Sequence, residues 1–244
     1  MPRTILRLTG GDTRDFLQGL VTNDVRKLDT DGIVYAALLT PQGKFIADFF
    51  LVADGDAVLL DLDSALAAQV QQRLTMYKLR ADVQIAATDI QVQRGTGPAP
   101  EGAVTDPRSA ALGWRLYGAD EGDDGTDWAA LRVANLIPET GEELTPDTFI
   151  LETGFDRLNG VDFRKGCYVG QEVTARMRHK TELRKGLVRV AVSGDAAPGD
   201  EITADGKPAG TLHTRAGDEA IAYLRFDRAT GEMRAGDAVV TRLE

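Results

Sequence analysis

The stretch from Lys165 to Glu172, with the sequence KGCYVGQE, carries the residue types in this chain that are best suited to chemistry. Cys167, the only cysteine among 244 residues, lies between two glycines there. Glycines loosen the backbone, and a helix is expected to begin just after them. Backbone N–H groups at a helix start attract anions, and the helix dipole lowers the pKa of a nearby thiol. The pattern therefore predicts an anion-facing turn beside a thiol that could react.

Two interpretations of Cys167 follow from its neighbours. Single cysteines are most often buried and inert. Arg164, Lys165 and a helix start would instead favour a thiolate that attacks, is oxidised or binds metal. His179 and His213 are the only histidines, so a Cys/His metal cage within the chain is not expected. The role of the thiol stays open between the first two interpretations.

Cations gather around this stretch although the protein as a whole is acidic. Between residues 164 and 185 two acidic side chains stand against seven basic ones, which are Arg164, Lys165, Arg176, Arg178, Lys180, Arg184 and Lys185. The formal net charge of the chain is −10. This reversal favours an anionic partner such as a carboxylate-bearing cofactor, a phosphate or an acidic macromolecular face. A solvated helix with scattered basic residues explains the same pattern, and the net charge argues against general DNA binding.

The composition limits the class of protein. Hydrophobic residues make up 43% and charged residues 27% of the chain, as in ordinary folded soluble proteins. No apolar run approaches the roughly 20 residues that cross a bilayer, and the first residues lack the apolar core of a secretory signal. A single cysteine fits a reducing compartment. We therefore expect a cytoplasmic protein without a membrane span.

Residues 33–62 are expected to form three antiparallel strands, at 33–39, 44–52 and 57–62, because β-branched and large apolar residues alternate with turn signals. Asp48 interrupts the second strand and shares a face with Ile46 and Phe50. If that face is the core, its carboxylate is half-buried with a perturbed pKa; a solvent-facing rim is the alternative.

The rest of the chain mixes helices with strands, which predicts an α+β fold. A helix of about four turns is expected to begin at the Asp63–Ser64 cap, and another covers 127–135. Beyond residue 184 short strands alternate with glycine, proline and aspartate turns. That spacing predicts a small β-barrel, with a domain boundary near residue 185.

Several motifs resemble those of a known family. Residues 159–161, the KGCYVGQE stretch and Thr174-Ala175-Arg176 are similar to the signature of the YgfZ/GcvT-like folate-binding proteins, which include iron–sulfur cluster assembly factors. Residues 16–19, 22–25, 40–44 and 77–83 match in the same order. With the barrel included, the resemblance covers nearly the whole chain.

The resemblance implies a folate-binding region at 1–184, built from two subdomains that are intertwined in sequence, and a barrel domain at 185–244. The implied cofactor is tetrahydrofolate, and the implied reacting groups are Cys167 and Asp48. The implied folate contacts are Asn23, Arg80, Lys165, Gly166, Tyr168, Gly170, Gln171, Glu172 and Arg176. No metal site is implied.

The resemblance also implies a function in the assembly or repair of iron–sulfur clusters, including those of radical enzymes that modify transfer RNA. Expected partners are folate and iron–sulfur client or assembly proteins. Tetrahydrofolate-dependent aminomethyl transfer, as in the glycine cleavage T-protein, is the alternative. Asp48 aligns with one member of the T-protein's aspartate pair, but Ala47 replaces the other, so the assembly function is preferred.

Overall fold

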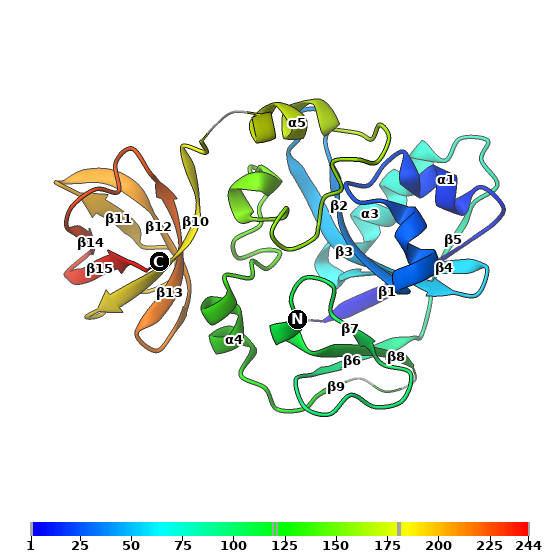
Figure 1. Cartoon of the computed structure of the whole chain (residues 1–244), viewed down its shortest axis with the longest axis horizontal. Helices are drawn as coiled ribbons and strands as arrows, with labels where there is room; N and C mark the ends of the chain where they lie inside the picture. The colour runs from blue at the N-terminus through cyan, green and yellow to red at the C-terminus, as the bar shows by residue number, and fades with distance from the viewer. Residues whose placement is uncertain (1, 119, 121, 180–181, 244) are drawn as a thin grey trace. The chain divides into compact units, whose positions relative to one another are not determined.

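The computed structural model in Figure 1 describes residues 2–118, 120, 122–179 and 182–243. The chain forms two compact units. The first consists of Met1–Thr126 and Phe155–Ala175, and the second of Asp127–Gly154 and Arg176–Glu244. Residues 127–154 and 176–184 therefore group with the barrel, whereas the sequence suggested a single division at residue 185.

A five-stranded sheet forms the centre of the first unit, in the order β2-β3-β4-β1-β5. All its neighbouring strands are antiparallel. The strands are β1 (Arg3–Thr9), β2 (Ile33–Leu39), β3 (Phe45–Asp54), β4 (Ala57–Asp63) and β5 (Gln84–Ala87). The expected three-stranded meander is confirmed, with β2 at its predicted bounds.

The strand β3 is buried on both faces over Phe45–Val52, because each face has its own cover. On one face Phe49 and Leu51 pack with the helix residues Leu17, Val70 and Leu74. These helices are α1 (Thr13–Gln18) and α3 (Ser64–Tyr77). The predicted cap of α3 is confirmed, since Asp63 accepts the backbone N–H of Ala65 at 2.7 Å. The opposite face of the sheet carries Asp48 and Phe50, as strand alternation predicts.

Two further elements of the first unit bear on the site. A short 3-10 helix, η1 (Val25–Lys27), runs into α2 (Leu28–Asp31) just before β2. A second sheet has the order β7-β8-β6-β9. Its strands are β6 (Gln91–Gly95), β7 (Val104–Thr105), β8 (Trp114–Gly118) and β9 (Gly122–Asp123), with a 3-10 helix, η2 (Ala110–Leu112), before β8.

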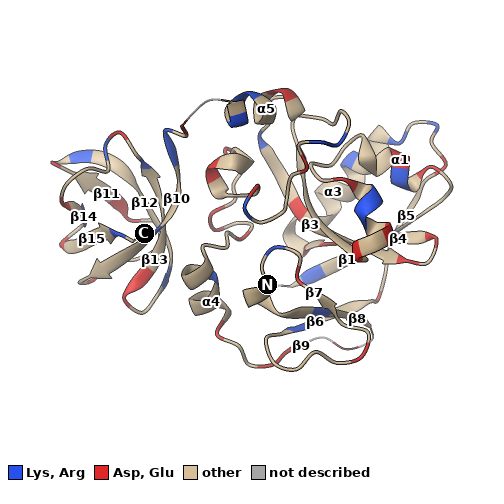
Figure 2. Ribbon diagram, in the orientation of Figure 1, with Lys and Arg blue, Asp and Glu red and all other residues tan. Residues whose placement is uncertain are grey.

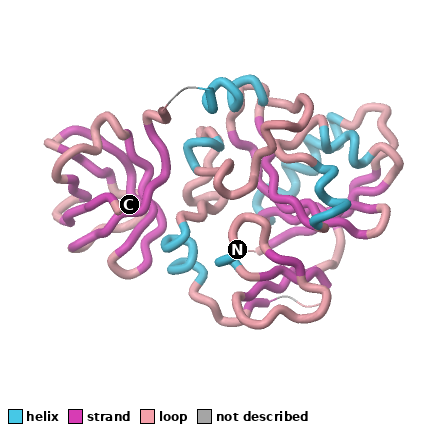
Figure 3. Tube along the Cα trace, in the orientation of Figure 1, coloured by secondary structure: helices cyan, strands magenta, loops and turns pink. Residues whose placement is uncertain are grey.

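The second unit contains a closed six-stranded barrel in the order β10-β13-β12-β11-β14-β15. Figure 3 shows the barrel as strands, in magenta, joined by loops, in pink. The strands are β10 (Lys185–Ser193), β11 (Glu201–Ala204), β12 (Lys207–Ala216), β13 (Glu219–Arg225), β14 (Met233–Ala235) and β15 (Ala238–Arg242). The expected barrel is confirmed. Its short strand β14 escaped prediction because three residues show too little alternation.

Two helical segments, α4 (Trp128–Asn135) and η3 (Ile150–Thr153), belong to the second unit as well. The helix α5 (Gln171–His179) begins within the KGCYVGQE stretch, at its last two residues, and precedes the barrel strand β10 in the chain. No helix among the described residues has both the length and the apolar character that a membrane crossing requires.

Candidate functional site

Lys165 fastens the cysteine-bearing stretch to a loop near the start of the chain. Its ammonium donates to the backbone carbonyls of Gln18, Val21 and Asn23 at 2.8, 2.5 and 2.9 Å. The residue is 5% exposed, and its nitrogen lies 5.1 Å from the ring centre of Tyr168. Burial lowers the pKa of Lys165 to about 8, so most of the amine keeps its proton at pH 7. An ammonium has three N–H donors, and all three are used here.

Cys167 lies on the exposed side of this anchored stretch. The buried and inert interpretation therefore does not describe its position. The helix α5 begins at Gln171, four residues further on. Because the dipole effect is confined to the first turn of a helix, it does not explain a reactive thiol at Cys167.

Gly170 allows the stretch to fold back against the turn at residues 40–43. Its φ is +84°, and a Cβ atom there would lie 2.7 Å from the carbonyl oxygen of Thr40. Gly43 faces the same junction with φ +75°, and an added Cβ would lie 2.8 Å from Cβ of Val173. Two motifs far apart in the sequence thus meet at a contact that only glycine permits.

Gly170→Ala is expected to lower the free energy of unfolding by about 2 kcal/mol, because the side chain adds both strain at positive φ and a clash. Gly166→Ala in the same motif is the matched control: nothing lies within 4 Å of its added Cβ, and its φ is not positive. Urea unfolding at pH 7 measures both. Equal stabilities of the two variants would contradict this account of Gly170.

A pocket of about 430 Å³ opens in the first unit, at the loop that Lys165 holds. Its apolar lining comes from Ile33, Val34 and Pro107, and its polar lining consists of Asn23, Lys27, Asp31, Tyr35, Thr105 and Asn159. Ligand sites for small molecules have volumes of roughly 300–1,000 Å³ and a few converging polar groups. The pocket meets both conditions.

Asn23 lines the pocket, but its amide is fully occupied in holding the wall together. The NH₂ group donates to the carbonyls of Tyr35 at 2.8 Å and Asn159 at 2.6 Å. The amide oxygen accepts from the backbone N–H of Asp24 and from the Lys27 ammonium. Two donors and two acceptor positions are the capacity of this side chain. Asn159 extends the wall by donating to the Pro107 carbonyl at 2.9 Å.

Tyr35 separates Asp48 from the pocket. Its hydroxyl donates to Asp48 Oδ2 at 2.9 Å, and its ring stacks on Phe155 with ring centres 5.1 Å apart. Burial, with the Asp48 charge, raises the pKa of Tyr35 well above its usual value. Asp48 itself is 8% exposed and does not line the pocket. The burial of Asp48, which one of its two interpretations expected, is confirmed.

A buried layer of charges supports this side of the sheet. Tyr35, Phe50 and Asp61 are cross-strand neighbours on β2, β3 and β4. Asp61 accepts from Arg3 Nε at 2.7 Å, from Arg115 Nη2 at 2.6 Å and from the Tyr117 hydroxyl at 2.8 Å. Burial alone would raise the pKa of Asp61, but the two arginines outweigh it and hold the pKa below its usual value.

The second carboxylate of this layer is Asp106. It pairs with Arg108 at 2.8 Å and lies 3.6 Å from Arg115. The Arg115 guanidinium lies 4.0 Å from the ring centre of Phe50, and that of Arg108 lies 5.4 Å from the ring centre of Tyr35. The charged layer therefore holds the rings of Phe50 and Tyr35 in place, and Tyr35 lines the pocket.

Residues 184–243 match the family described as CAF17, C-terminal beta-barrel domain. The iron–sulfur cluster assembly factor IBA57, mitochondrial, of Mus musculus is 30% identical over 278 residues, covering 95% of this chain and 78% of the relative. The chain belongs to the IBA57 family.

Other comparisons agree with this membership. The human IBA57 protein is 29% identical with the same coverage. An IBA57 homolog of Mycosarcoma maydis is 35% identical over 76% of this chain, which spans 54% of that relative's length. The solved aminomethyltransferase T of the glycine cleavage system from Bartonella henselae superposes with a TM-score of 0.78 at 13% identity, over 99% of this chain and 82% of its own. The last likeness shows the fold alone.

Membership of the IBA57 family corrects one expectation. A cytoplasmic location was expected from the composition, but these relatives are named mitochondrial proteins. The amino-acid composition does not distinguish two reducing compartments, so this prediction was wrong. The iron–sulfur assembly family is confirmed, while the narrower YgfZ label stays a prediction.

The structure brings together only part of the residue set that sequence suggested for this IBA57 family member. Asn23 and Lys165 meet at the pocket loop, whereas Arg80 lies exposed on the turn after α3 and outside the pocket lining. Gly166 is exposed, Tyr168 and Gly170 are buried, and Gln171 is half-buried. Their folate contacts, and a catalytic role for Cys167 or Asp48, stay predictions.

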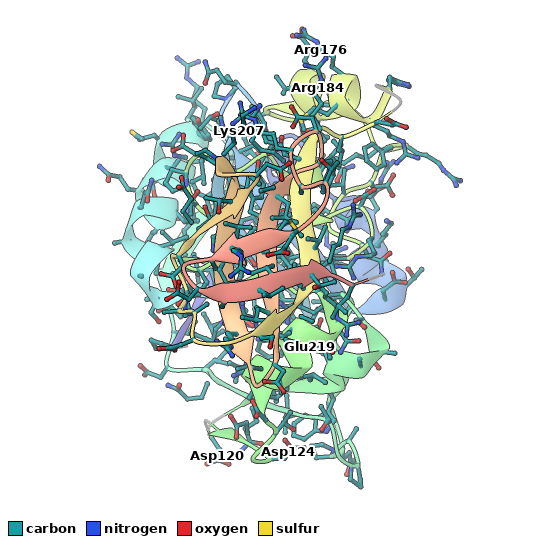
Figure 4. All side chains as sticks on the ribbon, turned by 90° about the vertical axis from the view of Figure 1, so that its left-hand side faces the viewer. Asp120, Asp124, Arg176, Arg184, Lys207 and Glu219 are labelled. Atoms are coloured by element: carbon teal, nitrogen blue, oxygen red, sulfur yellow. The ribbon has the colours of Figure 1, made fainter. Side chains whose placement is uncertain are left out.

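The basic stretch is divided by the fold. The helix α5 has Glu172 in its first turn and Arg176 and Arg178 in its last. The ribbon of α5 in Figure 2 accordingly has both red and blue segments. In Figure 4 Arg176 and Arg184 lie toward one end of the second unit, with Glu219 toward the other. Lys180 lies outside the described residues. In the part of the chain that is described, no group of three or more His, Cys, Asp or Glu side chains is placed to hold a metal ion.

Sequence reasoning missed most of the pocket. Lys27, Asp31, Tyr35 and Thr105 carry no motif of their own, and they come together only through the fold. A usable sequence signal existed for Asn159, because it stands in the family signature at residues 159–161.

Proposed function

We propose that this chain acts in the assembly or repair of iron–sulfur clusters and binds tetrahydrofolate in the pocket of the first unit. Membership of the IBA57 family supports the first part. The observation that carries the second is the connection of an exposed thiol, Cys167, to a ligand-sized pocket by the loop that Lys165 holds.

The pocket residues fit a reduced folate in size and chemistry. Folate has a pterin ring rich in N–H groups at one end and glutamate carboxylates at the other. Asp31 would accept from the pterin, and Lys27 would bind a carboxylate. Ile33 and Pro107 would cover the apolar middle. When bound, the folate supplies a carrier for a one-carbon unit.

The iron–sulfur cluster is cargo in this proposal. Cys167 is the group we propose to act on it, since thiolates are the preferred ligands of iron–sulfur clusters. Partners would be iron–sulfur client or assembly proteins, among them radical enzymes that modify transfer RNA. Aminomethyl transfer is the weaker candidate, because Asp48 lies behind Tyr35 and the transferase likeness extends to the fold alone.

Thr105→Trp is expected to weaken binding of 5-formyltetrahydrofolate at least about tenfold, because the indole would occupy space that a ligand of this size needs in the pocket. Thr105 is exposed on β7, so the change should leave stability within about 0.5 kcal/mol of wild type. Calorimetric titration measures the affinity. Thr241→Trp, an exposed strand position of the barrel, is the matched control and should bind like wild type. Absence of any binding by the wild-type chain would reject the folate part of the proposal.

A further inference from the structure

Lys27 belongs both to the pocket wall and to the contacts of the thiol segment, by which we mean residues 162–168. Its ammonium lies 2.7 Å from Asp162 Oδ2 and donates to Asn23 Oδ1 at 3.1 Å. An ammonium has three N–H donors. Among the described residues the Lys27 ammonium has two acceptors, Asp162 and Asn23, and the side chain is 41% exposed. The third donor is thus left for a group that enters the pocket.

Asp162 holds the turn that leads to Cys167. Its Oδ1 accepts the backbone N–H of Arg164 at 2.7 Å and that of Lys165 at 3.2 Å. Burial alone would raise the pKa of Asp162, but the Lys27 ammonium and these two N–H groups hold it below its usual value. The backbone N–H of Asp162 also donates to the Thr22 carbonyl at 3.0 Å. The Asp162 carboxylate thereby connects Lys27 in the pocket to the backbone of Arg164 and Lys165, which lie three and two residues before Cys167.

The charges in the pocket select the kind of ligand that would use this connection. Lys27 is its cation, and Asp31, four residues later, is its carboxylate. A ligand that carries an anion at one end and N–H donors at the other satisfies both. A ligand carboxylate that binds Lys27 must share its ammonium with Asp162. Because the two carboxylates repel each other, the Lys27–Asp162 ion pair is weaker when the ligand is bound.

We infer that Lys27 transmits the occupancy of the pocket to Cys167, through its ion pair with Asp162. The inference rests on the proposed function, because the ligand is taken to be a reduced folate bound by a carboxylate. Binding weakens the Lys27–Asp162 pair, the turn at Arg164 and Lys165 loosens, and the exposed thiol of Cys167 is held less rigidly. The coupling is reciprocal, so a change at the thiol segment also alters the affinity for the ligand.

The Lys165 clamp limits how far this change extends. Its three carbonyl acceptors lie at Gln18, Val21 and Asn23, and none of them depends on Asp162. The thiol segment therefore stays attached to the pocket loop while its turn relaxes. We expect a change in the rate at which Cys167 reacts rather than a rearrangement of the unit.

The test is the rate of alkylation of Cys167 by iodoacetamide in the full chain at constant pH, with and without saturating 5-formyltetrahydrofolate. The wild-type rate should rise about 5-fold or more on binding, the lower end of usual coupling. Asp162→Asn should react fast without ligand and show no further rise, while calorimetry shows that it still binds. Asp29→Asn, an exposed carboxylate outside the pocket lining, is the matched control and should respond like wild type.

Separate results would overturn the inference and the proposed function. If the ligand binds by calorimetry but the wild-type rate does not change, or if Asp162→Asn responds as wild type does, the inference fails and folate binding stands. If nothing binds, the folate proposal fails. The ligand-free rate of Lys27→Gln then still bears on the connection: a rate above that of wild type supports it, and an unchanged rate overturns it.

Discussion

Asp61→Asn is expected to lower the free energy of unfolding at pH 7 by about 3–5 kcal/mol, which is the usual cost of breaking a buried ion pair. Asp61 is fully buried and accepts hydrogen bonds from Arg3, Arg115 and Tyr117. Asparagine keeps the shape but removes the charge that compensates two guanidinium groups. It also turns a donor NH₂ toward groups that are donors themselves.

The matched control for this variant is Asp54→Asn on the neighbouring strand. Asp54 pairs with Arg7 at 2.7 Å, but both side chains are more than a third exposed. Exposed pairs contribute about 0–1 kcal/mol. In chemical unfolding the free energies of unfolding of the two variants should therefore differ by several kcal/mol. Similar losses of stability in both variants would show that the buried charges around Asp61 do not stabilise the sheet.

The effect of Asp61→Asn should also depend on pH. The folded pKa of Asp61 lies below its unfolded value, which is about 3.9. Its contribution to stability is then fully present above about pH 4 and is lost as the pH falls through the folded pKa. The difference between wild type and variant should narrow in acid. A difference that stays constant down to pH 3 would contradict the assignment.

Lys165→Met is expected to lower the free energy of unfolding by about 3 kcal/mol, because three buried carbonyls lose a charged hydrogen-bond donor. In a Trp128→Phe background, Trp114 is the only remaining tryptophan and reports on the first unit. Urea unfolding, followed by the fluorescence of Trp114, measures the change in stability. Arg164→Met replaces the exposed cation next to Lys165 and should stay within about 0.5 kcal/mol of wild type. Equal stabilities of the two variants would show that Lys165 does not clamp the loop.

The fold was largely predictable because its signals are local. The meander β2-β3-β4, the Asp63 cap of α3 and most barrel strands follow from alternation and turn residues within a few positions. The same alternation placed Asp48 and Phe50 on one face. The short strand β14 and the grouping of residues 127–154 with the barrel depend on distant contacts, which no local pattern reveals.

The site was less predictable because its contacts join distant parts of the chain. Asn23 and Asn159 meet across 136 positions, and Lys165 reaches Gln18 across 147. The positive charge of Lys165 suggested an anion ligand, yet its donors are used by backbone carbonyls. A sequence shows that a cation is present, but not whether the fold already supplies its acceptors.

We propose that this chain supports iron–sulfur clusters through the pocket of the first unit and Cys167. The most direct measurement is the activity of iron–sulfur enzymes under oxidative stress in cells that lack the gene, with variants returned one at a time. We expect the activities to fall without the chain and to recover with wild type, but not with Cys167→Ser or with a stably folded Thr105→Trp. Unchanged activities in the absence of the gene, or full recovery with both variants, would contradict the claim.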